Sequence, residues 1–254
     1  MSRKVIDMAD FGKAKRRLHS SQYYVAYIDI LGTKKIVQND ENDNYLNDLN
    51  NICKNAIKRV SWFGENKKDR FIKIFSDNIL IAIKWDENDN EDNDKFSLFT
   101  QLIGSIQNRA LIKGYLVRGG IAKGAFYKCN TFVHGKALID AVLLEENNAI
   151  YPRIIIQPGI KSSLPFIKKD EDGLYYINSY QCSVTSIVTM AKPILLDKLR
   201  ESKKDLKVRQ KVLWAINYHN NHVMHLLSYN VPEFAEYNED FITEQEIENI
   251  IKDE

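Results

Sequence analysis

Two aspartates end hydrophobic segments of the chain, and their carboxylates could bind a divalent cation. Asp29 closes an apolar run that begins at Tyr23 and stops just before Gly32. Asp77 lies in a short polar break between two runs, 70–75 and 79–84, that are rich in β-branched and aromatic residues, the pattern of a β-hairpin. Carboxylates at the ends of neighbouring strands supply the hard oxygen ligands that magnesium prefers. The sequence therefore predicts a metal site made by Asp29 and Asp77.

The break at Ser76, Asp77 and Asn78 also has an ordinary structural interpretation, because these residue types are common in tight turns. The second aspartate favours a functional interpretation. Two buried carboxylates without a metal or another counter-charge would destabilise the fold.

The elements that position these residues follow from apolar periodicity. Apolar residues at helical spacing predict helices at 33–60, 96–113 and 135–145, and strands are predicted at 22–31, 70–84 as a hairpin, 115–126 and 152–157. This order predicts an α+β sandwich with a ferredoxin-like βαββαβ core. Glycines 119, 120 and 124 interrupt one strand, which indicates that another backbone or a ligand approaches closely there.

Three parts of the chain are predicted: an N-terminal arm (1–20), an α+β domain (21–160) and a mostly helical C-terminal extension (161–254). The extension is predicted to have a short strand over 174–178, after the turn at Asp172 and Gly173. It has helical spacing over 193–229, where His219 and His222 are interpreted as packed residues of a helix and not as metal ligands. Its acidic, amphipathic tail (240–254) is a candidate contact with a partner subunit. The acidic run 86–94 lacks the glycine and the terminal glutamate of a calcium loop, so we expect an exposed loop.

Composition narrows the class of protein. The 254 residues carry a net charge of +2, which gives no basic surface for bulk nucleic acid, and 44% of them are apolar, as in soluble proteins. Three widely spaced cysteines form neither a zinc motif nor a disulfide framework. No apolar run approaches the ~18 residues of a membrane span. We expect a cytoplasmic protein with no membrane contact.

Residues 22–157 resemble the catalytic domain of class III nucleotidyl (adenylate and guanylate) cyclases. Four blocks carry the resemblance in the family's order: the strand 27–32 with its aspartate, the hairpin 73–77, the glycine-rich strand 118–124, and the helical block 133–145. The last two are similar to the family's Arg-x-Gly-Ile-x-x-Gly strand and to its Gly-x-x-Val-Asn-x-Ala-x-Arg-Leu-Glu helix. The ferredoxin-like core would then be a cyclase (palm) core.

The resemblance implies a reaction and a set of ligands. Two Mg²⁺ or Mn²⁺ ions held by Asp29, Asp77 and the carbonyl of Ile30 would act on a nucleoside triphosphate, giving a 3′,5′-cyclic nucleotide and pyrophosphate. The resemblance also implies a homodimer that shares its sites across the interface. Near the nucleotide the resemblance places Gly32 and Thr33 with Lys34 or Lys35 at the phosphates, Lys73 at the base, and Ser76 as a further nucleotide-binding residue.

Three departures affect this interpretation. The family's transition-state asparagine and arginine fall on Ile139 and Leu143, and its base-reading aspartate falls near Phe132. Such donors are typically worth a few kcal/mol of barrier. Either Arg118, as a catalytic residue, and Arg153, as a nucleotide-binding residue, supply the missing charge, or the site is degenerate.

Three hypotheses stay open from the sequence. The first is an active cyclase, and such divergent cyclases resemble bacterial anti-phage signalling enzymes that make cyclic pyrimidine nucleotides, which implies a role in signalling or antiviral defence. The second is a degenerate cyclase-homology domain that acts as a nucleotide sensor or interaction module. The third is a palm-type synthase of cyclic oligonucleotides, although Ser76-Asp77-Asn78 offers one acidic residue where such palms usually carry two.

Overall fold

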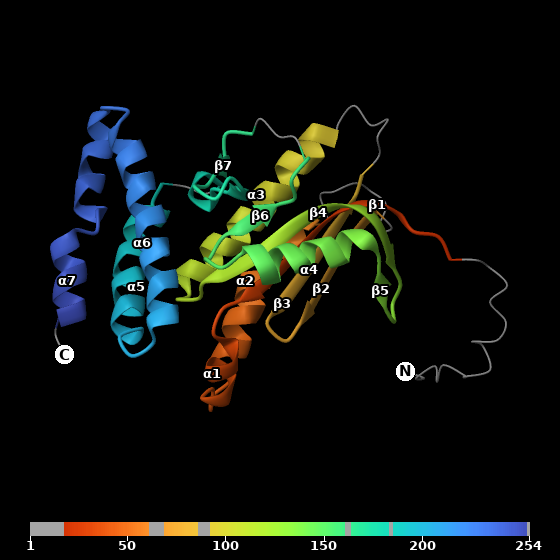
Figure 1. Ribbon diagram of the computed structural model, residues 1–254, viewed down its shortest axis with the longest axis horizontal. Coiled ribbons are helices and arrows are strands. Elements are labelled where there is room, and N and C mark those ends of the chain that lie inside the picture. The colour runs from red at the N-terminus through yellow and green to blue at the C-terminus, as the bar shows by residue number, and fades with distance from the viewer. Residues whose placement is uncertain (1–17, 61–68, 86–91, 161–163, 183–184, 253–254) are drawn as a thin grey trace.

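The computed structural model describes residues 18–60, 69–85, 92–160, 164–182 and 185–252 (Figure 1). Most of the predicted N-terminal arm and most of the acidic run 86–94 lie outside these residues. In chain order the elements are β1 (Ser21–Ile30), α1 (Thr33–Gln38), α2 (Asn44–Val60), β2 (Arg70–Phe75), β3 (Asn78–Lys84), α3 (Asp92–Ile112), β4 (Val117–Lys128), β5 (Val133–His134), α4 (Lys136–Asn148), β6 (Ile154–Ile156), β7 (Ile167–Lys169), β8 (Tyr175–Ile177), the 3₁₀ segment η3 (Ser179–Cys182), α5 (Ile187–Glu201), α6 (Leu206–Leu227), the 3₁₀ segment η4 (Pro232–Asp240) and α7 (Glu244–Lys252).

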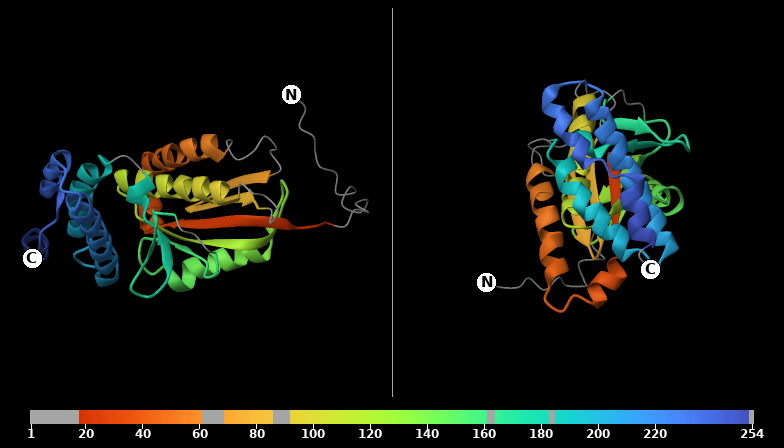
Figure 2. Two further views of the ribbon diagram at one scale, coloured as in Figure 1. Left: turned by 90° about the horizontal axis from the view of Figure 1, so that it is seen from above. Right: turned by 90° about the vertical axis from the view of Figure 1, so that its left-hand side faces the viewer.

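One mixed sheet organises the fold. Its strand order is β2-β3-β1-β4-β6-β8-β7, and β5 pairs with β4 off this path. Strand β1 is antiparallel to both β3 and β4, and β3 is antiparallel to β2, whereas β4 and β6 are parallel. Helices α2 and α3 cover one face of the sheet and α4 covers the other (Figure 2). This arrangement confirms the predicted α+β sandwich with a βαββαβ core.

Strand β1 shows why the sheet is buried on both faces. Successive side chains of a strand point to opposite faces. Ala26 and Ile28 therefore join the core under α2 and α3, whereas Val25 and Tyr27 lie in the smaller cluster under α4. Burial on both faces explains why this strand reads as a nearly continuous apolar run in the sequence.

The glycines of β4 allow α4 to approach the sheet closely, as the sequence predicted. A Cβ on Gly120 would lie 2.3 Å from the carbonyl oxygen of Ala141 in α4, and one on Gly119 would lie 2.5 Å from that of Tyr27. Since real Cβ atoms do not come that close to backbone oxygens, only glycine fits at both positions.

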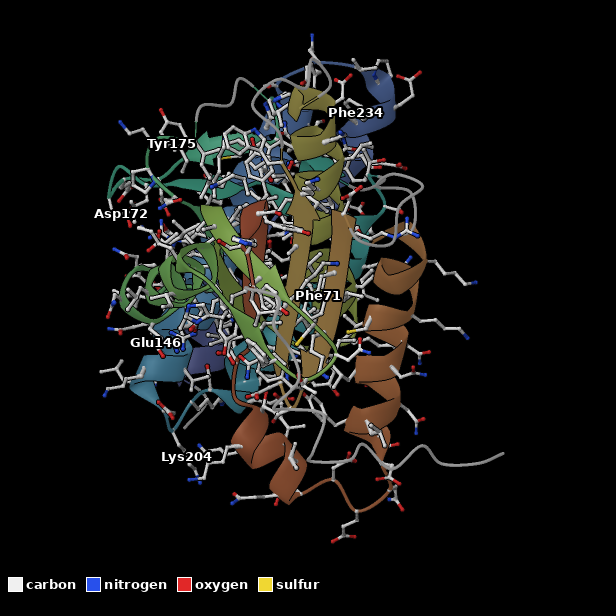
Figure 3. The ribbon with its side chains drawn as sticks, turned by 90° about the vertical axis from the view of Figure 1, so that its right-hand side faces the viewer. Phe71, Glu146, Asp172, Tyr175, Lys204 and Phe234 are labelled. Carbon is white, nitrogen blue, oxygen red and sulfur yellow. The ribbon has the colours of Figure 1, made fainter. Side chains whose placement is uncertain are left out.

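The C-terminal part contains the short strand predicted over 174–178 as β8, and also β7, which the sequence did not predict. The hairpin of β7 and β8 extends the sheet beyond residue 160, and Asp172 and Tyr175 mark it at the edge of the molecule (Figure 3). Helices α5, α6 and α7 then form a separate layer at one end of the sheet (Figures 1 and 2). They share an apolar cluster of their own, which Leu111 of α3 joins. Among the described helices, none has both the length and the apolar composition that crossing a membrane requires.

His219 and His222, two of the three histidines of α6, are packed residues, as predicted. His219 is fully buried, and its ring contacts the hydroxyl of Tyr180 at 3.1 Å and the carbonyl oxygen of Asp240 at 2.8 Å. His222 stacks on the ring of Tyr180 at a centroid distance of 5.1 Å. Both side chains therefore join α6 to its neighbours.

Candidate active site

A two-residue turn presents Asp77 at the tip of the β2–β3 hairpin. Phe75 and Asn78 are paired across the two strands, so only Ser76 and Asp77 connect them. Ser76 has a φ of 55°, the left-handed conformation that such short hairpin turns require. The side chain of Asp77 is partly exposed. Its Oδ1 accepts a hydrogen bond of 3.1 Å from the side-chain amide Nδ2 of Asn78.

The hairpin tip lies directly beside the end of β1. Asp29 is paired with Asn78 on one side and with Arg118 of β4 on the other. The backbone N–H of Ile30 donates to the carbonyl oxygen of Asp77 at 3.2 Å. The two aspartates predicted from the sequence are thus adjacent at one end of the central strands.

Arg118 is the counter-ion at the centre of this site. Its Nε donates to Oδ2 of Asp29 at 3.2 Å, and its Nη2 lies 2.6 Å from Oε1 of Glu145 in α4, an ionic contact without hydrogen-bond alignment. The Glu145 side chain is 4% exposed, that of Asp29 is 18% exposed and that of Arg118 is 24% exposed. One arginine therefore joins acidic groups from a strand and from the helix that covers it.

The pKa shifts reflect this crowding of charge. Burial raises the pKa of Asp29; Arg118 opposes the shift, and the nearby charge of Asp77 adds to it. Burial likewise raises the pKa of Glu145, again against the effect of Arg118. Burial, followed by the charges of Glu145, Asp29 and Asp77, raises the pKa of Tyr27 to about 12. Carboxylates from β1, from the hairpin turn and from α4 therefore act on one small region.

The turn after β1 adds the carbonyl of Ile30 and the N-terminus of α1 to the candidate site. Gly32 has a φ of 81° and precedes α1, and the buried hydroxyl of Thr33 donates to the carbonyl oxygen of Ile30 at 2.6 Å. Lys34 is exposed on the first turn of α1. Lys73 is exposed on β2, two residues before Phe75. Alternation along the paired strands gives it the same sheet face as Asp29.

The structure does not bring Arg153 into this group. Its side chain is 2% exposed and is paired with Asp170 and Asp172 of the β7–β8 hairpin. These bonds and the charges of the two aspartates raise the pKa of Arg153 against the effect of burial. A contact with nucleotide would therefore require the buried Arg153 guanidinium to leave both aspartates.

The positions that depart from the family pattern are exposed apolar side chains. Phe132 is 49% exposed, Ile139 54% and Leu143 46%. Ile139 and Leu143 are four residues apart in α4, so they lie on one face of that helix. This face offers no side-chain hydrogen-bond donor at either position.

A hard divalent cation fits the donor atoms present. Arg118 occupies Oδ2 of Asp29 and Asn78 occupies Oδ1 of Asp77, so each carboxylate keeps one further oxygen, and the Ile30 carbonyl keeps its second lone pair. Two carboxylates and a carbonyl form a set typical of magnesium sites that also use water and phosphate ligands. No cluster of three or more acidic, histidine or cysteine side chains suited to a metal occurs in the part of the chain that the structure describes.

Sequence reasoning missed two charged groups here. Glu145 was noted only as part of a helix motif, although an acidic residue on the inner face of an apolar helix is a signal for a buried ion pair. Lys211 of α6 also acts on this site, since its charge affects the pKa of Asp29 and that of Glu145. Nothing in the local sequence around Lys211 points to this role.

Comparisons with known proteins give only structural similarity. No protein family matches the sequence, and no curated protein does. The adenylyl cyclase CyaB from P. aeruginosa is similar with a TM-score of 0.47 and 17% identity, over 62% of this chain and 94% of that one. A guanylyl cyclase domain of the RhoGC fusion protein from Blastocladiella emersonii has a TM-score of 0.47 and 14% identity, over 63% of this chain and 98% of that one. A bacterial light-regulated adenylyl cyclase has a TM-score of 0.45 and 11% identity, over 70% of this chain and 100% of that one. At these values the likeness concerns part of the fold and assigns no activity to this chain.

Proposed function

We propose that the protein is a nucleotide cyclase that converts a nucleoside triphosphate to a 3′,5′-cyclic nucleotide and pyrophosphate. The observation that carries the proposal is the adjacency of Asp29 and Asp77 at the end of β1, next to the Ile30 carbonyl and the start of α1. In this reaction the ribose 3′-oxygen bonds to the α-phosphorus, its proton leaves to water, and the bond from the α-phosphorus to the bridging oxygen breaks.

Asp29, Asp77 and the Ile30 carbonyl would hold the two Mg²⁺ or Mn²⁺ ions. When bound, such ions stabilise charge on the phosphates and lower the pKa of the attacking hydroxyl. Thr33 fixes the orientation of the Ile30 carbonyl by its hydrogen bond. Arg118 limits the repulsion between Asp29 and Glu145, which keeps Asp29 ionised and available as a ligand.

The remaining nucleotide contacts come from the rim of the site. Gly32, Thr33 and Lys34 at the start of α1 and Ser76 in the hairpin turn would face the phosphates, and Lys73 would face the base. We leave Arg153 outside the pocket because its guanidinium is already paired with two aspartates.

We further propose that the active species is a homodimer. Ile139 and Leu143 cannot donate hydrogen bonds, so donors have to come from elsewhere, and the exposed apolar face of α4 is a candidate contact surface. Sedimentation at assay concentrations tests this. Full activity in a strictly monomeric species would contradict a shared site. The role in signalling or antiviral defence that the resemblance implies stays a prediction.

One observation favours the second candidate, a degenerate domain that senses nucleotide without converting it. Arg118 already provides a counter-charge for Asp29, so the carboxylate is partly neutralised without any metal. Under this hypothesis the protein binds a triphosphate and releases it unchanged.

The deciding experiment incubates the purified protein with each of the four ribonucleoside triphosphates and with Mg²⁺ or Mn²⁺, and identifies products by mass spectrometry. A cyclase yields equal amounts of cyclic nucleotide and pyrophosphate, and only when metal is present. Binding without product supports the sensor, and linked or cyclic oligonucleotides would support a palm-type synthase instead.

A further inference from the structure

The C-terminal helices reach the candidate active site from the end of the sheet. Trp214 and Ala215 of α6 lie around a small cavity together with Leu116 and Val117, the residues that lead into and open β4. The next residue of β4 is Arg118. The helix is therefore packed against the strand end that carries the counter-ion of Asp29.

The start of α6 lies close to α1 as well. Asp205 is the N-cap of α6 and accepts a hydrogen bond from the backbone N–H of Val208, and its carboxylate is 3.9 Å from the amino group of Lys35 in α1. Lys204 marks this end of the helical layer near α1 (Figure 3). The first turns of α6 thus lie between α1 and the end of β4.

Lys211 lies in this part of α6 and faces the site. It is four residues before Ala215, so both side chains lie on the same side of the helix. Its side chain is half-buried. Burial and then the charge of Arg118 lower the pKa of Lys211, whereas Asp29, Asp205 and Glu145 raise it. The lysine therefore belongs to the same group of charges as the candidate metal ligands.

The charges of this group and their ion pairs indicate that Lys211 could bind a phosphate group. Asp29, Asp77, Glu145, Glu146 and Asp205 carry five negative charges, and Arg118 and Lys211 carry two positive ones, which leaves −3. Divalent cations would make the group positive, as a triphosphate needs. Arg118 is held by Asp29 and Glu145, whereas no ion pair of Lys211 with a carboxylate occurs within 4.0 Å among the described residues.

We propose that Lys211 binds the triphosphate, so that the C-terminal extension adds a phosphate contact to the site of its own chain. A lysine acts on phosphate as a mobile point charge at the end of a flexible stem, which suits a group that enters from a neighbouring layer. This inference rests on the proposed function, because it assumes that the phosphates lie between Asp29 and the start of α1. It gives the helical extension a direct role in substrate binding.

Binding of nucleotides that cannot cyclise tests the inference. Fluorescence anisotropy or calorimetry with 3′-deoxynucleoside triphosphates, in the presence of Mn²⁺, measures affinity without turnover. Lys211→Met and Lys211→Gln should each weaken triphosphate binding by about 10- to 100-fold, the value of one charge-assisted contact. Both should leave the affinity for the matching nucleoside monophosphate within about threefold, because the lost contact is with the outer phosphates.

Two further variants separate this role from a structural one. Lys211→Arg should restore most of the lost affinity, since it keeps the charge. Lys207→Met removes an exposed lysine one turn earlier in α6 and should bind like the wild type. Circular dichroism melting identifies any variant that fails to fold. The affinities of the folded variants then decide whether Lys211 binds the triphosphate.

The possible failures are distinguishable. If the wild type binds triphosphate and both Lys211 variants bind it equally well, the inference is overturned and the proposed function stands. Equal losses for triphosphate and monophosphate would also overturn it. If the wild type binds none of the four triphosphates, the proposed function fails together with the inference.

Discussion

Replacing Arg118 by methionine tests the central claim that one arginine is the counter-ion of two carboxylates, the half-buried Asp29 and the buried Glu145. The change removes the 3.2 Å hydrogen bond to Asp29 and the 2.6 Å contact with Glu145, while keeping an apolar stem of similar length. Removing one partner of a buried ion pair costs about 3–5 kcal/mol. Because the Arg118 side chain is 24% exposed, water screens part of this loss, and we expect about 3 kcal/mol at pH 7.5.

The loss should depend on pH in a definite direction. Burial already raises the pKa of Asp29 and that of Glu145 above their usual values of 3.8 and 4.5, and Arg118 opposes both shifts. Without Arg118 both pKa values rise further, so the folded variant binds more protons than its unfolded chain from about pH 4 upward. Its stability then falls as pH rises through this range. The difference from the wild type should therefore be smaller at pH 5 than at pH 7.5.

The assay is urea unfolding followed by tryptophan fluorescence, without added metal, at both pH values. Arg200→Met is the matched control, because Arg200 forms a surface ion pair with Asp197 and both side chains are more than half exposed. Such pairs contribute about 0–1 kcal/mol. A loss in Arg118→Met that is below about 1 kcal/mol at pH 7.5, or that is equal at the two pH values, would refute the reasoning.

Three further predictions follow from the fold and the site. Asp77→Asn should abolish product formation while the urea midpoint stays near that of the wild type, because the change removes metal charge and not packing; near-normal turnover would make Asp77 only a turn residue. Gly120→Ala should lower the free energy of unfolding by about 1–3 kcal/mol, since its Cβ would force α4 away from β4, and an unchanged urea midpoint would contradict this close approach. Burial and then the charge of His225 lower the pKa of His222 to about 4, so the wild type should lose stability as pH falls from about 6.5 toward 4; His222→Phe should lose less in thermal melts over that range, and parallel losses would exclude His222 as the cause.

Much of the fold could be predicted from the sequence because its signals are local. Alternating and continuous apolar runs indicate strands, helical spacing indicates helices, and a short polar break between two strand-like runs indicates a hairpin. These signals placed Asp29 at the end of β1 and Asp77 in the hairpin turn. The glycines of β4 likewise indicated the close approach that Gly120 makes with α4.

The C-terminal extension contains an element that local sequence signals did not predict. Its helices were expected over 193–229, and the structure has α5 and α6 there. A short strand was expected over 174–178, and the structure has β8 there, whereas β7 was not predicted. Strands of three residues such as β7 carry little periodicity of their own. Their pairing with the sheet stabilises them, and this pairing is a long-range property.

The partners of the charged residues were decided by tertiary structure alone. Arg118 meets an aspartate 89 residues earlier in the chain, because the antiparallel register of β1 and β4 places the two opposite each other. Arg153 resembled a free cation in the sequence, yet the β7–β8 hairpin pairs it with two aspartates. Lys211 approaches the site only because α6 packs against the end of β4. A sequence specifies the type and local geometry of each side chain, whereas register and packing between distant elements determine which charges meet.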